Sequence, residues 1–233
     1  MNFSGDYFTH QVLPQLLQAI PITLMLTLFG ALGSLVLGLP LAIALGSVRR
    51  RLRWPAQVYT TVIRGTPLLV QIYLIYYGLG SLVPRSWMRD SWASPLLRDA
   101  FWYGLAALII NEAAYVAVIL RGGLDVVPLG EREAATALGL SRRALWIKVL
   151  IPRVTMITLP VLGNELVLLL KSTVLVSTIT IFDVLGTANL IRFKTFRVLE
   201  PLLGAAMIYV LLVLAITLII WPFERRFSQM RAR

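Results

Sequence analysis

The sequence has no cysteine and a single histidine, His10, so the usual thiolate metal ligands and the usual base of nucleophilic catalysis are nearly absent. Charge is scarce as well, because only 14% of the 233 residues are charged and the first basic residue is Arg49. A cleavable signal peptide begins with a positively charged region, so the first apolar segment is expected to remain as a membrane span. No Pro/Ser/Gly-rich linker divides residues 1–233, which predicts one domain.

Apolar residues dominate the composition. They make up 58% of the chain, and the mean hydropathy is +0.79, which exceeds what one soluble core can bury. Five segments approach the roughly 20 apolar residues that a helix needs to cross a bilayer. The expected spans are residues 16–48, 57–83, 100–120, 154–170 and 201–222, with Pro21 opening the first crossing helix. The sequence therefore predicts an all-α integral membrane protein with five transmembrane helices.

The net charge of +11 bears on orientation once the basic residues are placed. Of the 22 Lys and Arg residues, 15 fall in segments that share one side when the N-terminus is outside. Short cytoplasmic loops are enriched in Lys and Arg, so the pattern predicts an outer N-terminus and a cytoplasmic C-terminus. The expected partner of this charge is the lipid bilayer, and nucleic acid is not expected.

Residues 171–200 allow two interpretations. The part between Ser172 and Phe182 is apolar and rich in β-branched residues, but it is too short to cross alone. It is either a broken or re-entrant element buried against protein, or a simple outward extension of the fourth helix.

Polar residues return at 125–152, between the third and fourth spans. Residues 131–138 are good helix formers, Gly139 suits a left-handed helix C-cap, and residues 142–151 can form a second helix that Pro152 ends. Two short helices joined by a sharp turn are therefore expected on the cytoplasmic side. An ordinary amphipathic loop, with arginines against anionic lipid head groups, is the alternative interpretation.

This segment resembles a cytoplasmic loop of the permease subunits of bacterial ABC importers. That loop carries Glu-Ala-Ala, three residues, Gly, nine residues and then Ile-x-Leu-Pro. Glu133, Ala134, Ala135 and Gly139 occupy the first four positions here, and Val149-Leu150-Ile151-Pro152 occupies the last four.

Two further motifs resemble the polar amino acid branch of that family, of the histidine, lysine, arginine and ornithine type. One is Arg64-Gly65-Thr66-Pro67-Leu68, with Gln71 following, and the other is Asn164-Glu165-Leu166 followed by Leu170-Lys171-Ser172-Thr173. The three motifs occur in order over residues 64–186.

The resemblance implies that the 125–152 loop docks on a separate cytoplasmic ABC ATPase dimer. Glu133 is then the polar contact, Ala134 and Ala135 form the close-packing face, and Gly139 permits the turn. ATP and Mg²⁺ belong to that ATPase, in agreement with the lack of a G-x-x-x-x-G-K-[S/T] phosphate loop in this chain. The implied protein is no enzyme. It holds no cofactor and lies in the bacterial inner membrane with a second permease, identical or sister, and an extracytoplasmic solute-binding protein.

Ionisable residues inside the expected spans are candidates for the solute pathway, because charge in a bilayer is costly. Glu165, with Asn164 beside it, either binds the cationic group of a solute or fixes helix packing. The resemblance favours basic amino acids as solutes. Glu112 is a weaker candidate that can instead serve as a structural partner of Arg64. Lys171 either meets a solute carboxylate near the outer gate or extends to the interface.

A different class of protein fits some of these features. An ATP-independent secondary transporter or channel subunit can use Glu165 to carry protons or cations, although five spans without an inverted repeat argue against it. Small residues at Gly30, Gly33 and Gly204 predict close helix packing without identifying the partner.

Overall fold

The computed structural model describes residues 4–84, 86–87 and 91–231, and this part of the chain is helical and contains no strand. Arg85, Arg89 and Arg233, three of the residues used to assign orientation, lie outside the described residues. Along the described chain the helices are α1 (Gly5–Tyr7), η1 (Phe8–Val12), α2 (Leu13–Leu45), α3 (Arg50–Gly65), α4 (Leu68–Tyr73), η2 (Leu74–Leu79), α5 (Gly80–Leu82), α7 (Ser94–Arg98), α8 (Ala100–Val126), α9 (Leu129–Ala137), α10 (Arg142–Leu145), η3 (Trp146–Leu150), α11 (Ile151–Ser172), η4 (Thr173–Ile179), α12 (Val184–Thr195) and α13 (Leu199–Arg231).

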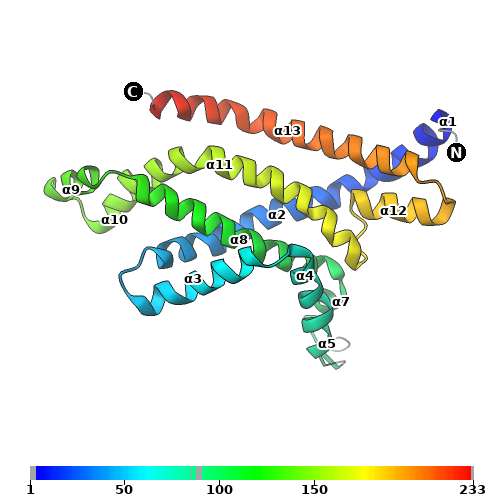
Figure 1. Ribbon diagram of the computed structural model, residues 1–233, viewed down its shortest axis with the longest axis horizontal. Coiled ribbons are helices and arrows are strands. Elements are labelled where there is room, and N and C mark those ends of the chain that lie inside the picture. The colour runs from blue at the N-terminus through cyan, green and yellow to red at the C-terminus, as the bar shows by residue number, and fades with distance from the viewer. Residues whose placement is uncertain (1–3, 85, 88–90, 232–233) are drawn as a thin grey trace.

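Long apolar helices form the body of the molecule. Within the described residues, Gly5–Leu45, Ala100–Val126, Arg142–Ile179 and Leu199–Pro222 are each long and apolar enough to cross a membrane, and one bent helix pair makes a fifth candidate. The helices α2, α8, α11 and α13 lie along one another (Figure 1). The end of the bundle with α9 and α10 is called the α9 end, and the opposite end, with α1 and α12, the α12 end.

Proline does not divide the first span as the sequence suggested. Pro21 and Pro40 both lie inside α2, which runs unbroken from Leu13 to Leu45. The expectation that Pro21 opens the crossing helix was wrong. Proline is tolerated inside membrane helices because neighbouring groups satisfy the freed backbone. At about 1.5 Å per residue, the 33 residues of α2 extend about 50 Å, which is longer than the hydrocarbon core.

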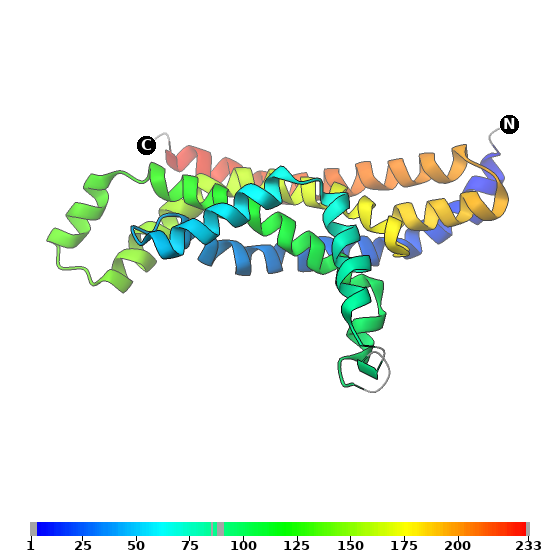
Figure 2. The ribbon, with the colours of Figure 1, turned by 60° about the horizontal axis from the view of Figure 1, so that its bottom comes forward.

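The second expected span, residues 57–83, is not one helix. α3 ends at Gly65, and the segments Arg50–Gly65 and Leu68–Leu82 meet at an angle of 106°. Thr66 and Pro67 between them have extended backbone, as the steric effect of a proline on the preceding residue favours. The pair α4–α5 leaves the bundle sideways (Figure 2). Arg64 therefore lies at a bend inside the apolar segment, and not at the end of a span.

The structure combines both interpretations of residues 171–200. α11 continues past Lys171 into the 3₁₀ turn η4, so the fourth helix does extend. The chain then breaks at Thr180, which has a left-handed backbone with φ of 66°, and continues as the separate helix α12. α12 packs against α2 and α13 at the α12 end (Figure 1).

A buried aspartate fixes this break in place. Asp183 is 0% exposed, its Oδ1 accepts a hydrogen bond from the Gly186 N–H at 2.8 Å, and its Oδ2 accepts one from the Tyr209 hydroxyl at 2.8 Å. The neighbouring Val184 N–H donates to Thr23 Oγ1 at 3.2 Å. One side chain thus caps α12 and ties it to α13, while the next residue ties it to α2.

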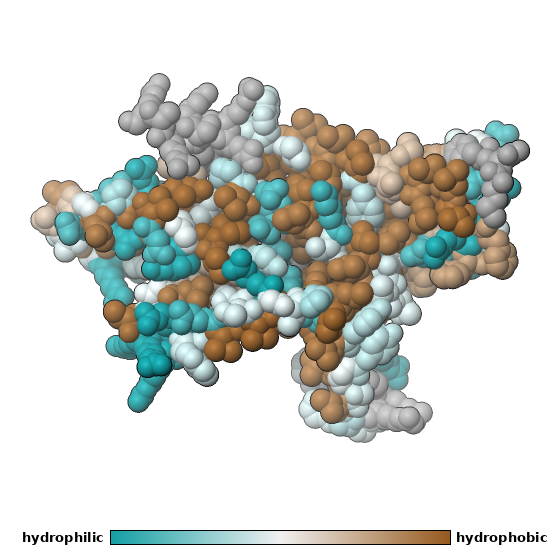
Figure 3. Space-filling model, viewed as in Figure 1, coloured by the Kyte–Doolittle hydropathy of each residue, from teal (hydrophilic) through white to brown (hydrophobic). Residues whose placement is uncertain are grey.

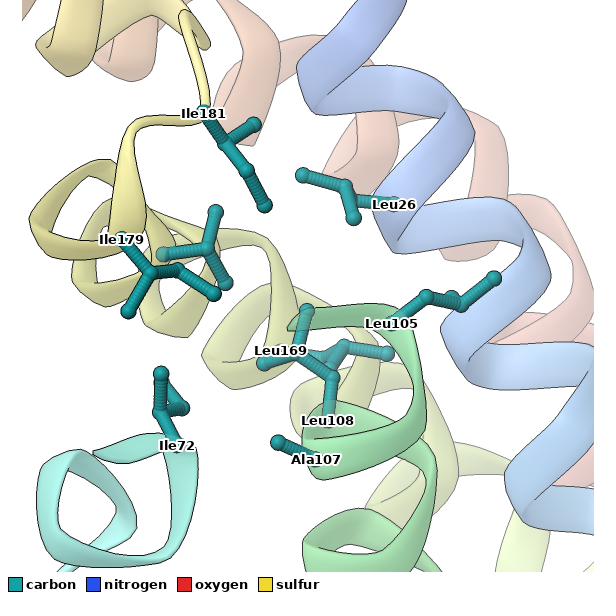
Figure 4. Close-up of a cluster of buried hydrophobic side chains, with 9 residues drawn as sticks. Leu26, Ile72, Leu105, Ala107, Leu108, Leu169, Ile179 and Ile181 are labelled. Atoms are coloured by element: carbon teal, nitrogen blue, oxygen red, sulfur yellow. The ribbon is translucent and has the colours of Figure 1, made fainter. Parts of the chain in front are cut away.

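Buried apolar side chains join the helices near the centre of the bundle (Figure 4). This cluster consists of Leu26, Ile72, Leu105, Ala107, Leu108, Leu169, Val176, Ile179 and Ile181. The predicted close packing at small residues occurs inside this chain: a Cβ on Gly33 would lie 2.5 Å from Ile109 Cδ1, so α2 and α8 approach closely there.

Much of the surface is apolar as well. Brown, hydrophobic patches extend over the central helices, and hydrophilic side chains gather toward the α9 end (Figure 3). Exposed large apolar residues run along α2 and α13. Apolar surface on this scale is what a helix bundle presents to lipid or to another membrane subunit.

Candidate functional site

Two acidic residues lie on neighbouring helices near the middle of the bundle. Glu112 on α8 is 7% exposed, and Glu165 on α11 is half-buried. The two helices pack on each other, and each of the two residues lies well inside its helix. In the described part of the chain, neither has a Lys or Arg at ion-pair distance. An ionised carboxylate inside membrane helices attracts a cation from outside the chain.

Arg64, at the end of α3, is the basic residue near this acidic pair. Its guanidinium carbon lies 5.2 Å from the centre of the Tyr115 ring on α8, and it is close enough to attract Glu165. It forms no ion pair with Glu112 among the described residues. Arg64 is exposed, so it can move without leaving a buried charge behind.

The bend between α3 and α4 is held by an amide side chain. Gln71 Nε2 donates to the Ile63 carbonyl at 2.8 Å and to Thr66 Oγ1 at 2.8 Å, and its Oε1 accepts from Asn111 Nδ2 at 3.1 Å. Gln71 and Asn111 are both buried. The bend is thereby fastened to α8 beside Glu112. The sequence showed both residues, but only their contacts reveal this positioning role.

The polar segment 125–152 has the predicted turn. Gly139 has φ of 75°, and the Leu140 N–H donates to the Ala135 carbonyl at 3.1 Å, as in a left-handed C-cap. Ser141 Oγ then accepts from the Ala144 N–H at 3.3 Å and caps α10. Arg153 Nη2 binds Glu131 Oε1 at 2.9 Å and holds α9 against α11.

The second short helix does not end where the sequence suggested. α10, η3 and α11 follow one another without a break, and Pro152 lies in the first turn of α11. The expectation that Pro152 ends the helix was wrong, because proline is tolerated inside membrane helices where local π adjustments satisfy the freed backbone, and the π turn η3 comes directly before it. α9 is therefore the one separate short helix of this segment.

The exposed face of α9 differs from the predicted one in one position. Glu133 and Ala134 are exposed, but Ala135 is 4% exposed and packs inside this chain. Arg132, Glu133, Thr136 and Ala137 line a surface hollow of about 360 Å³. This hollow beside Glu133 is shallow and open, so the surface is accessible to a partner.

Residues 38–229 match the family described as the binding-protein-dependent transport system inner membrane component. The chain belongs to this family. It is 43% identical to the octopine transport system permease protein OccM of Rhizobium radiobacter over 94% of this chain and 91% of that protein. It is 35% identical to the arginine transport system permease protein ArtQ of Bacillus subtilis over 92% of this chain and 93% of that protein.

A solved structure agrees with this assignment. The crystal structure of an amino acid ABC transporter with histidines contains a chain that is 34% identical, with a TM-score of 0.82 over 97% of this chain and 100% of that chain. The permease fold over the full described length is therefore established, and the resemblance drawn from the three motifs is confirmed.

The permease does not bring all predicted pathway residues together. Asn164 is exposed and lines a cavity of about 120 Å³ between α11 and α13. No described residue of α8, the helix that carries Glu112, lines this cavity. Lys171 is exposed, and it makes no ion pair within the described residues. Glu112 and Glu165 are thus the two predicted residues that share a site.

No set of three or more His, Cys, Asp or Glu side chains suited to a metal ion occurs among the residues that the structure describes. The chemistry available at the acidic pair is electrostatic binding and release of a cation.

Proposed function

We propose that this permease carries cationic amino acids or their derivatives across the bacterial inner membrane, past Glu112 and Glu165. The observation that carries the proposal is the pair of carboxylates on α8 and α11, which has no ion-pair partner in the described part of the chain. Carboxylates at bilayer depth are costly unless a cation compensates them.

A guanidinium group suits such a pair. It is planar, always charged and able to donate to two carboxylates at once, whereas an ammonium group is a compact point charge. The relatives named for octopine and arginine carry solutes with a guanidinium group, which agrees with the same chemistry here. Arg64 lies over the Tyr115 ring and forms no ion pair with Glu165 in the described chain, which leaves Glu165 available to a solute cation.

The energy for this step is proposed to come from a separate ATPase that binds this chain. Residues 1–233 form one permease domain with the N-terminus outside and the C-terminus in the cytoplasm, which puts α9 on the cytoplasmic side. An ABC ATPase dimer binds ATP and Mg²⁺ there and contacts Glu133 and Ala134, while the buried Ala135 packs α9 onto its own chain. Gly139 sets the turn, and Pro152 lies in the continuous helix that leads to Glu165.

The other partners follow from the same assembly. A second permease, identical or sister, completes the pathway, and an extracytoplasmic solute-binding protein delivers the solute at the α12 end. Asn164 and Lys171 remain part of the proposed pathway, at the α13 side of α11 and at the outer end of α11.

Uptake by the reconstituted transporter tests the proposal. Arginine and citrulline have nearly the same shape, but citrulline replaces the guanidinium with a neutral urea group. Glu165→Gln should lower arginine uptake about tenfold and citrulline uptake by less than about twofold, since one charge contact is lost. Asp6→Asn, the same kind of change at an exposed position on α1, is the matched control. Equal losses for both solutes would assign Glu165 to packing.

A further inference from the structure

A second charged site lies at the α9 end, apart from the acidic pair. A cavity of about 700 Å³ opens there between the α2–α3 connection, the end of α8 and the segment from α9 to η3. Four of its lining residues are arginines, namely Arg49, Arg121, Arg132 and Arg142. The volume is in the range of ligand pockets, and the function proposed above uses none of these side chains.

Most of this positive charge is not neutralised by the chain itself. Arg121 pairs with Asp125 on α8, but in the described part of the chain no carboxylate is at ion-pair distance from the other three arginines. Arg132 donates through Nη2 to the Leu124 carbonyl, while its Nε is buried without a hydrogen-bond partner. A buried donor without a partner is costly, so the site indicates an acceptor that comes from elsewhere. Together with the arginine charge that no nearby carboxylate of the described residues offsets, this favours an anion as the acceptor.

The other walls of the cavity are apolar. Pro40 and Ile43 come from the last turns of α2, and Trp146 comes from η3. Ile43 is 47% exposed, and Val36 and Leu39 continue the same face of α2 as further exposed apolar residues. An anion with a hydrocarbon tail can place its charge among the arginines and its tail along α2. A small inorganic anion gains nothing from these walls.

We propose that the cavity binds the phosphate of an anionic phospholipid, such as phosphatidylglycerol, with its acyl chains along α2. Arginine forks match phosphate oxygens, and basic pockets between membrane helices on the cytoplasmic side bind anionic head groups. In the orientation proposed above, the cavity faces the cytoplasmic leaflet, and its wall contains Trp146, a residue type enriched at membrane interfaces.

The bound lipid links two parts of the permease that share few direct contacts. Arg49 follows α2, whereas Arg132 lies in α9 and Arg142 begins α10 after the turn. A phosphate between them holds the connection from α2 to α3 against the segment that carries Glu133. Gly46 contributes to the shape of the site, because a Cβ there would collide with the Arg121 guanidinium.

Native mass spectrometry of the delipidated transporter complex, with phosphatidylglycerol and phosphatidylcholine of equal chain length, tests the site. Wild type should bind phosphatidylglycerol at least about tenfold more tightly. The double variant Arg49→Gln/Arg121→Gln should lose about 25-fold in this affinity, since each basic group near a phosphate contributes about fivefold. The control Arg50→Gln/Arg51→Gln removes equal charge beside the cavity and should change the affinity by less than about twofold.

Several outcomes would overturn the assignment. Equal losses in the two double variants would reduce the binding to general charge attraction. Equal affinity of wild type for the two lipids would exclude the site, whether or not the variants fold. Complete displacement of lipid by inorganic phosphate would assign the arginines to a free anion. If the assembled complex retained neither lipid, the cavity would be assigned to contact with the ATPase. By contrast, Glu165→Gln should bind phosphatidylglycerol as tightly as wild type. This result would keep the lipid test separate from the cationic-solute proposal.

Discussion

The acidic middle of this permease and its basic α9 end are opposite in charge but alike in lacking internal partners. Glu112 and Glu165 have no ion pair in the described part of the chain, and of the four cavity arginines only Arg121 has one. The difference is depth: the carboxylates lie midway along α8 and α11, whereas the arginines lie where α2 and α8 end. Depth and sign together select the ligand, a passing cation in the middle and a resident anion at the end.

The largest effect is expected when a positive charge, as found at the α9 end, replaces the negative charge of Glu165 in the middle of the bundle. Glu165→Lys places an ammonium group near Arg64, so the site repels a cationic solute instead of attracting it. We expect arginine uptake to fall by about 100-fold or more, with Glu165→Asp retaining a measurable fraction. Uptake of radiolabelled arginine into proteoliposomes measures the change. Near-normal uptake by the Lys variant would remove the acidic pair from the pathway.

The α9 end can be tested without altering the middle. Glu133→Lys reverses the charge of an exposed residue beside the surface hollow on α9. If α9 docks on an ATPase, uptake should fall about tenfold or more while basal ATP hydrolysis continues. Parallel assays of ATPase activity and uptake on the same preparation measure the uncoupling. Glu133→Gln should lie between wild type and the Lys variant, and normal uptake in both variants would argue against docking at this residue.

A third change sharpens the distinction between charge and geometry in the middle. Gln71→Leu removes the hydrogen bonds that hold the α3–α4 bend and leaves Asn111 without its partner. We expect a loss of about 2–3 kcal/mol in stability, from one buried amide without a partner and the lost bonds. Arginine and citrulline uptake should decline by the same factor. A selective loss of arginine uptake would instead make Gln71 part of the charge-selective site.

The smallest expected effect is at the α12 end, remote from both charged regions. Tyr209→Phe removes one hydrogen bond to the buried Asp183 and should cost about 1–2 kcal/mol. Thermal unfolding of the purified protein measures it, with exposed Tyr77→Phe as the matched control. An identical melting temperature for both variants would show that the Asp183 contact adds no stability to α12.

The sequence predicted best what local chemistry decides. The left-handed turn at Gly139 and the family motifs around Glu133 depend on neighbours within a few residues, and both expectations were confirmed. The apolar helices were also correct in kind, because composition alone requires them. The number of spans depends on whether the bent α3–α4 pair counts as one.

Features that depend on contacts between distant segments were missed. The segment is apolar on both sides of Gly65 and Pro67, so the sequence did not indicate the 106° bend there. Hydrogen bonds of Gln71 on α4 and Asn111 on α8 hold this bend. The same limit applies to Ala135, whose burial depends on how α9 folds back, and to the four cavity arginines, which come from separate segments. Charge patterns predict a side of the membrane for these arginines but not their meeting point.

Direct solute binding tests the central claim that the acidic pair selects a cation. Binding of arginine and citrulline to the purified permease–ATPase complex, measured by calorimetry without the solute-binding protein, isolates the contribution of the membrane site. The account predicts that wild type prefers arginine by about tenfold or more and that Glu165→Gln loses this preference while its stability is unchanged. Equal affinities of wild type for the two solutes, or an unaltered preference in the variant, would contradict it.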